Sequence, residues 1–300
     1  MHNTSQSTGY LRTETQLKDM EGVDTASIQS TMVGPLWARA TFSKRYRHIL
    51  KDQEASHIFA KVAKKHPEAE AKFAAMEQLV DQFLGLFFLV RARVIDESVR
   101  NYLIGNPEAS VVNLGCGLDT AFTRVDNGRL LWFDLDLPDA IDYRLGLIPE
   151  TTRSKCIPKS VFELSWFDDI DFTPTRGAFF IAAGLFSYFS EAALISLCNS
   201  MAERFTGAEL MFDAGSRLGN VFVNRRFKKY GITGLKQHFD LGDPVRQLSK
   251  WSDKIEVIEW FPHFARTQRE QTWKWKTRTL MNLCDWFNLS KFAHVRFMSR

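Results

Sequence analysis

The feature that most constrains the fold is a short apolar run that leads directly into a Gly-x-Gly turn, within residues 111–120. Gly115 and Gly117 allow the chain to turn tightly with its backbone close to a ligand. A second apolar run ends in acids, and Asp136 follows Gly117 by about the twenty residues typical of a ribose-binding acid. The pattern therefore predicts an α/β fold with a parallel sheet that binds a nucleoside where two neighbouring strands end.

Strand candidates alternate with helical segments after this turn. The expected strands are residues 110–114, 130–134, 154–157, 178–182 and 209–212, and a helix is expected at 191–205. Apolar strands separated by helices are typical of a parallel sheet covered on both faces. Two further alternating segments, 255–260 and 293–298, could pair antiparallel at the sheet edge. The basic and aromatic segment 262–289 between them is too long for a hairpin turn and is predicted to be an insertion.

The first part of the chain is expected to form a loose arm followed by a helical lid. The amphipathic stretches lie at 32–47, at 55–65 and from about 68 to 103. His66-Pro67 breaks the pattern and Gly105-Asn106-Pro107 ends it. We therefore expect a lid over residues 1–108 and a core over 109–300, in which the basic segment 217–250 is helical.

Composition excludes several classes of protein. The chain has 39 lysines and arginines against 35 acids, and a net charge of +4 is too balanced to imply nucleic acid or a membrane surface. The four cysteines form no Cys-x-x-Cys pair, so zinc ribbons are not indicated, and reduced thiols are typical of the cytoplasm. The apolar stretch Phe83 to Val90 is far shorter than the roughly 20 residues that span a bilayer. We expect a cytoplasmic protein that binds no metal and takes a small-molecule partner.

Two nucleoside cofactors compete for a turn of this kind: a nicotinamide dinucleotide and S-adenosylmethionine. The dinucleotide fingerprint requires a third glycine, where this chain has Thr120. Asp119 would also place a negative charge where the pyrophosphate meets a helix start. S-adenosylmethionine has no phosphate and carries an ammonium group, to which an acid can hydrogen-bond. Local electrostatics favour S-adenosylmethionine, with a nicotinamide dehydrogenase as the alternative.

The sequence around the turn, VNLGCGLDT at 112–120, followed by FDLDLP at 133–138, resembles the leucine carboxyl methyltransferase family. That family includes the bacterial O-methyltransferases of tetracenomycin type. The resemblance extends over roughly Gly22 to Phe212 and includes RARVID at 91–96. It implies a class I methyltransferase fold, a Rossmann-like seven-stranded sheet with a helical N-terminal lid, and S-adenosylmethionine as cofactor. It also implies O-methylation of a carboxylate or hydroxyl of a small molecule.

The resemblance further implies roles for individual residues. Arg93 matches the lid arginine that holds the methionine carboxylate, for which a planar, bidentate guanidinium is suited. Gly115 and Gly117 match the turn beneath the methionine half of the cofactor. Asp136 matches the ribose-binding acid, and Asp134 is the second candidate for that role.

Other positions match the adenine site or depart from the family pattern. Phe162 and Glu163 match the pair that contacts adenine. The family usually carries a glutamate before Gly184, where this chain has Ala183. Since that glutamate is expected to contact the methionine portion, Asp119 or a backbone carbonyl would have to receive the ammonium instead. Otherwise cofactor affinity is weakened, and the protein is a homologue with reduced or lost activity.

No residue stands out as a general base. A carboxylate acceptor needs none at neutral pH, whereas a phenol or alcohol does. Tyr188 is expected to line the acceptor site, and His238 is the titratable candidate in the region after the sheet. The 262–289 segment could cap an aromatic, anionic acceptor or be a solvated helix. A protein carboxyl methyltransferase is a further alternative, although Ala38 stands where the protein-phosphatase branch has a lysine.

Overall fold

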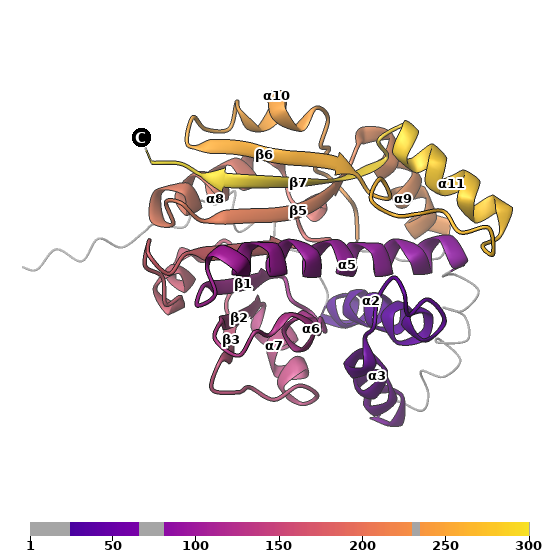
Figure 1. The fold of residues 1–300 in the computed structure, drawn as a ribbon, viewed down its shortest axis with the longest axis horizontal. Helices are drawn as coiled ribbons and strands as arrows, with labels where there is room; N and C mark the ends of the chain where they lie inside the picture. The colour runs from indigo at the N-terminus through magenta and orange to yellow at the C-terminus, as the bar shows by residue number, and fades with distance from the viewer. Residues whose placement is uncertain (1–24, 66–80, 230–234, 300) are drawn as a thin grey trace, which may run out of the picture.

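Seven strands form one sheet with helices on both faces in the computed structural model, which describes residues 25–65, 81–229 and 235–299 (Figure 1). The strand order is β3-β2-β1-β4-β5-β7-β6. The strands are β1 (Ser110–Leu114), β2 (Leu131–Asp136), β3 (Ser154–Pro158), β4 (Ala178–Ala182), β5 (Glu209–Gly215), β6 (Ile255–Pro262) and β7 (Ser290–Phe297). The predicted seven-stranded α/β sheet is therefore confirmed.

Strands β1 to β5 are parallel, and their carboxyl ends share one edge of the sheet. β7 runs antiparallel to both β5 and β6, so the two last strands pair as expected. The pair lies at one edge of the sheet, where β6 forms the border and β7 lies between β6 and β5. This order makes β1 and β4 central strands, and every residue of both is buried.

Two cores cover the two faces of the sheet, because alternate side chains of a strand point to opposite sides. Val112 and Phe180 face the core that contains α8 (Glu191–Arg204). Their neighbours Val111 and Phe179 face the core formed with α5 (Gln82–Gly105) and α11 (Trp275–Trp286). The other described helices that follow β1 are α6 (Ala121–Val125), α7 (Pro138–Leu145), α9 (Arg217–Lys229), α10 (Pro244–Leu248) and the short 3-10 turns η2 (Leu164–Asp169) and η3 (Phe186–Tyr188).

The helical N-terminal region consists of α2 (Thr25–Arg45), α3 (Gln53–Lys65) and α5. Asp81 caps α5, since its carboxylate accepts a hydrogen bond from Leu84 N at 2.9 Å. From residue 82 the helix runs unbroken to Gly105, and the predicted helix from about 68 to 80 lies outside the described residues. α5 packs directly on the sheet. Among the helices of the described residues, none is long and apolar enough to cross a membrane.

The segment after β5 is less helical than the sequence predicts. α9 ends at Lys229 and the next helix is the short α10, so the prediction of helix over 217–250 is only partly right. Residues 237–241 instead run beside η3 and the end of β5: the backbone N–H groups of His238 and Leu241 donate to Ser187 O at 2.7 Å and Gly215 O at 2.9 Å. These tertiary hydrogen bonds replace those of a helix.

Candidate functional site

The candidate site lies where the carboxyl ends of β1, β2, β4 and β5 meet. Gly115 and Gly117, in the turn after β1, have φ values of +64° and +47°, which side chains disfavour. A Cβ atom on Gly115 would lie 2.6 Å from a methyl carbon of Leu185, and one on Gly117 would lie 3.1 Å from Cγ of Met32. The turn therefore requires glycine for both its conformation and its close approach to neighbouring side chains.

Asp136 lies at the tip of β2, against this turn. Its Oδ2 accepts a hydrogen bond from Gly117 N at 2.8 Å, and its Oδ1 accepts one from Leu137 N at 2.8 Å. Burial raises the pKa of this carboxyl group, and the two backbone N–H groups act in the opposite direction. Each oxygen keeps a further lone pair, so the carboxylate is held in place and can still accept two hydroxyl groups.

Asp134, the second candidate for that role, is engaged inside the fold. Its Oδ2 is 2.6 Å from Nη2 of Arg144, and its Oδ1 accepts a hydrogen bond from Asn113 Nδ2 at 3.2 Å. The same arginine donates through Nη1 to the carbonyl oxygens of Gly117 at 2.9 Å and Asp119 at 2.8 Å. Asp134 therefore supports the turn from beneath, with both side chains of the ion pair buried.

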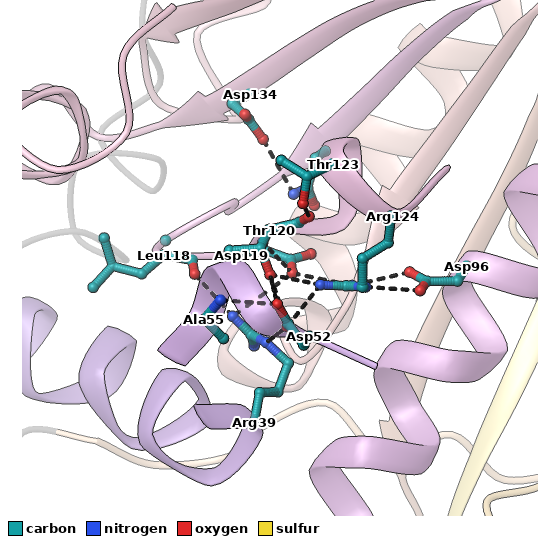
Figure 2. A network of polar contacts seen from close by, with 12 residues as sticks. Arg39, Asp52, Ala55, Asp96, Leu118, Asp119, Thr120, Thr123, Arg124 and Asp134 are labelled. Carbon is teal, nitrogen blue, oxygen red and sulfur yellow. Dashed lines mark hydrogen bonds and ion pairs between the residues drawn. The ribbon is translucent and has the colours of Figure 1, made fainter. Parts of the chain in front are cut away.

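A cluster of buried charges that the sequence analysis did not identify joins the lid helices to the core (Figure 2). At its centre, Arg124 of α6 donates to Asp96 of α5 at 2.7 Å through Nε and to Asp52 at 2.8 Å through Nη1. Asp52, just before α3, also accepts from Nε of Arg39 in α2 at 3.1 Å. The chain gives no signal for this cluster, because its members lie far apart in sequence and pair only through the fold.

Asp119 and Thr120 bring the turn into the same cluster. The hydroxyl of Thr120 donates to Asp52 Oδ2 at 2.8 Å, and Asp119 Oδ1 accepts from Thr120 N at 2.7 Å. Asp119 also lies 3.7 Å from Arg39 and 3.6 Å from Arg124. Burial disfavours its ionisation, but the two guanidinium groups outweigh burial and lower its pKa. With these partners, Asp119 is placed to hold the N-terminal helices to the turn, and two guanidinium groups already supply positive charge beside its Oδ1.

The structure brings Arg91, and not the predicted Arg93, to the strand ends. Arg93 donates to Glu97 at 3.0 Å and, through Nη2, to Arg266 O and Thr267 Oγ1 at 2.9 Å, so it faces the segment between β6 and α11. A Cβ atom on Gly184 would instead overlap Nη1 of Arg91. Two residues on a helix differ by about 200° in direction, so the two arginines point to nearly opposite sides of α5.

Asp213 and Tyr188 complete the group around Arg91. Asp213, within β5, accepts a hydrogen bond from Gly184 N at 2.6 Å, and its Oδ2 lies 3.7 Å from Nη1 of Arg91. Burial raises the pKa of Asp213 and Arg91 opposes the shift. Burial also raises the pKa of Tyr188, against the influence of Arg91. A tyrosine with a raised pKa stays protonated at neutral pH and can donate a hydrogen bond, but it is a poor base.

The remaining predicted residues lie around the same strand ends. Ala183 directly follows β4 and precedes Gly184. Phe162, after β3, packs edge-to-face on Phe189 with ring centroids 4.7 Å apart, whereas Glu163 is exposed and accepts from Ser165 Oγ at 3.2 Å. His238 is exposed, and its backbone rests on η3, the turn that contains Tyr188.

Comparisons with known proteins agree with this geometry. A sequence model of the leucine carboxyl methyltransferase family matches residues 32–202, more than half of the chain. The tetracenomycin polyketide synthesis O-methyltransferase TcmP of Streptomyces glaucescens is 28% identical over 229 residues, which are 75% of this chain and 79% of the relative.

Solved structures show the same fold at low sequence identity. A candidate methyltransferase from Thermobifida fusca YX superposes with a TM-score of 0.56 at 13% identity, over 77% of this chain and 89% of its own. A DUF574 family protein from Streptomyces avermitilis MA-4680 gives a TM-score of 0.56 at 12% identity, over 93% and 99%. The fold is that of the class I methyltransferases, and the matched segment contains the glycine turn, Asp136 and Arg91. The chain belongs to the leucine carboxyl methyltransferase family.

Proposed function

We propose that the protein is an S-adenosylmethionine-dependent O-methyltransferase that acts on a small molecule. The observation that carries the proposal is the carboxylate of Asp136, held at the tip of β2 by the N–H group of Gly117 in a methyltransferase fold. This is the arrangement expected of an acid that grips a ribose beside a glycine turn. The relationship to TcmP, an O-methyltransferase of polyketide synthesis, supports oxygen as the methyl acceptor and a small molecule as the substrate.

Residues of this chain suit each part of the cofactor. Asp136 would accept the ribose hydroxyls, and Phe162 would lie against the adenine, with Glu163 accepting from its amino group. Gly115 and Gly117 would let the backbone approach the methionine half. Because Arg91, and not Arg93, points to the strand ends, we assign the methionine carboxylate to Arg91.

Methyl transfer depends more on the alignment of donor and acceptor than on acid–base catalysis. S-adenosylmethionine supplies a methyl group that is bound to a sulfonium sulfur. When the methyl group is transferred, the rest of the cofactor leaves as a neutral thioether. The protein mainly has to hold donor and acceptor in line and exclude water, and such positioning is worth on the order of 7–11 kcal/mol. The protonated phenol of Tyr188 can orient an acceptor oxygen. A carboxylate acceptor then needs no base, whereas a phenol or alcohol would depend on His238 or on water.

Calorimetry tests the cofactor assignment. The wild-type protein should bind S-adenosylhomocysteine, and Asp136→Asn should weaken binding about tenfold or more, because a hydrogen bond to a charged group is lost. Asp126→Asn is the matched control, since Asp126 pairs with Arg153 away from the carboxyl ends of the strands. Absence of heat from the wild type with both S-adenosylmethionine and S-adenosylhomocysteine would contradict the proposal.

Methyl transfer tests the acceptor. Radioactive S-adenosylmethionine is incubated with the protein and a panel of carboxylic acids and phenols, and separately with a lysate. Label on a small molecule supports the proposal, and label on protein would favour a protein carboxyl methyltransferase. Cofactor binding without any transfer would favour a homologue of reduced activity. This alternative is worth testing because Ala183 stands in place of the family glutamate.

A further inference from the structure

The ion pair between Arg91 and Asp213 is longer than the ion pair that Asp134 forms with Arg144 at the same edge of the sheet. Arg91 Nη1 and Asp213 Oδ2 are 3.7 Å apart, which is longer than a hydrogen bond. Asp134 and Arg144, by contrast, are in direct contact at 2.6 Å. The side chains of Arg91 and Asp213 keep 16% and 7% of their surface exposed. The pair therefore consists of two opposite charges that are largely desolvated and only loosely joined.

The other acids near the turn have partners that are not expected to bind a ligand. Asp134 is bound by Arg144, and Asp119 accepts from Thr120 N beside two guanidinium groups. Asp136 is held by two backbone N–H groups and is the proposed ribose acid. Among the described acids at these strand ends, Asp213 is therefore the one whose cationic partner is itself expected to bind a ligand.

Binding of a carboxylate to Arg91 changes the surroundings of Asp213. The guanidinium would then be shared between two anions, and a buried carboxylate without a full counter-charge is costly. An ammonium group beside Asp213 removes that cost. In an α-amino acid, the carboxylate and the ammonium group are attached to the same carbon atom. The carboxylate can therefore pair with an arginine while the ammonium group pairs with an aspartate that faces it.

We propose that Asp213 receives the α-ammonium group of the cofactor's methionine portion while Arg91 receives its carboxylate, so that the two residues recognise the zwitterion together. The assignment depends on the proposed use of S-adenosylmethionine. The assignment also explains how the site can work with Ala183 in place of the family glutamate, because the acid is supplied by β5 instead. The backbone N–H group of Gly184, the residue after Ala183, donates to Asp213 at 2.6 Å and orients its carboxylate. Asp213 is a binding residue in this scheme and takes no proton from the acceptor.

The decisive variant is Asp213→Asn, because the amide oxygen can still accept the hydrogen bond from Gly184 N. Its affinity for S-adenosylhomocysteine should fall about tenfold to hundredfold. The desamino analogue, in which hydrogen replaces the ammonium, should bind Asp213→Asn as tightly as the wild type or more tightly, because Arg91 loses a competing anion. If Asp213 were only the counter-ion of Arg91, both ligands would bind the variant more tightly, which would overturn the proposal.

Two further ligand measurements keep this result interpretable. 5′-Methylthioadenosine lacks the amino-acid portion, so equal affinity in the wild type and in Asp213→Asn shows that the nucleoside site is intact. Should the variant fail to fold, the wild type alone decides: S-adenosylhomocysteine must bind at least about tenfold tighter than its desamino analogue. Equal affinity for these two ligands overturns the proposal. A wild type that binds none of the three ligands contradicts the proposed function itself, which is a different outcome.

Discussion

Arg144 binds the carboxylate of Asp134 and the carbonyl oxygens of the glycine turn with one guanidinium group. The ion pair connects β2 to the turn that follows β1, and both of its members are buried. The position of the turn therefore depends on a charged residue of α7.

Asp134→Asn should destabilise the protein, because the substitution leaves Arg144 buried without its counter-ion. Breaking a buried pair in this way costs about 3–5 kcal/mol. The free energy of unfolding is to be measured by urea titration. The same change at Asp126, which pairs with the partly exposed Arg153, should cost much less, because ion pairs at the surface contribute little. Equal losses in the two variants would show that the Asp134 pair does not carry the stability assigned to it.

Arg124→Gln should have a comparable effect for a different reason. Its guanidinium contacts Asp52 and Asp96, which are both buried. The variant would leave Asp96 without its close counter-ion, remove one of the two arginines that pair with Asp52, and hold the N-terminal helices less firmly. We expect a loss of about 3–5 kcal/mol in urea titration. Arg100→Gln is the control, because Arg100 is half exposed and reaches Asp96 only at 3.8 Å. A similar loss in the control would contradict the central role of Arg124.

The two arginines of α5 offer a matched pair of substitutions. Arg91→Gln should weaken the binding of S-adenosylhomocysteine about tenfold to hundredfold, because the proposed bond to the ligand carboxylate is lost. Arg93→Gln should leave the affinity within about twofold, since its guanidinium binds Thr267 and the carbonyl of Arg266. Calorimetry on both variants decides the assignment, and the reverse order of effects would restore Arg93 as the lid arginine.

Gly184→Ala should impair both stability and cofactor binding. Gly184 has a φ of +68°, where a side chain costs about 1–2 kcal/mol, and the added methyl group would displace Arg91. Gly105→Ala is the comparison, because a Cβ atom there meets nothing within 4 Å. Unfolding and S-adenosylhomocysteine titrations of the two variants should therefore diverge, and an unchanged Gly184→Ala protein would refute the described packing of Arg91.

His263 should make the fold sensitive to acid. Its ring is fully buried and stacks on the ring of Phe87, with the ring centroids 3.6 Å apart. Its Nε2 is hydrogen-bonded to the carbonyl oxygen of Phe87 at 3.0 Å. Burial lowers its pKa from 6.5 to about 3, so the unfolded chain binds a proton that the folded chain does not bind. Stability is therefore complete above pH 6.5 and falls as the pH decreases towards 3, by up to about 1.4 kcal/mol per pH unit.

His263→Phe keeps an aromatic ring between its neighbours and removes the titrating group. The urea midpoint of this variant should depend less on pH between 4 and 6.5 than that of the wild type, although the lost hydrogen bond lowers its stability at pH 7. The same pH dependence in both proteins would show that His263 is not responsible for it.

The parallel strands can be predicted from the sequence because each is an apolar run whose burial on both faces leaves a recognisable pattern. The ends of β2 and β5 are harder to predict. Acids at 134 and 213 suggest that the strands stop, whereas β2 continues through the buried Asp134 to Asp136 and β5 continues through the buried Asp213 to Gly215. Since residues two apart share a face of a strand, the sequence cannot distinguish Asp134 from Asp136, and the position of Arg144 in space does so.

The same limit explains the arginines of the lid. The sequence predicts α5 and places Arg91 and Arg93 on it, but the side that meets the strand ends depends on how the helix is rotated on the sheet. That rotation is set by the apolar residues of α5 packed against β1 and β4. The sequence gives no signal for the role of Asp213, because an acid at a predicted strand end is most simply interpreted as a solvated residue. Its partners Gly184 and Arg91 are brought to it only by the tertiary fold.

The place of β7 between β5 and β6 has a consequence for how this protein is made. β7 follows β6 in the chain, so a nascent polypeptide leaving the ribosome presents β6 before any strand exists with which it can pair. Until β7 emerges, β5 also keeps one side open to pairing with other chains. Completion of this sheet therefore waits for β7, which is made after the other six of its strands.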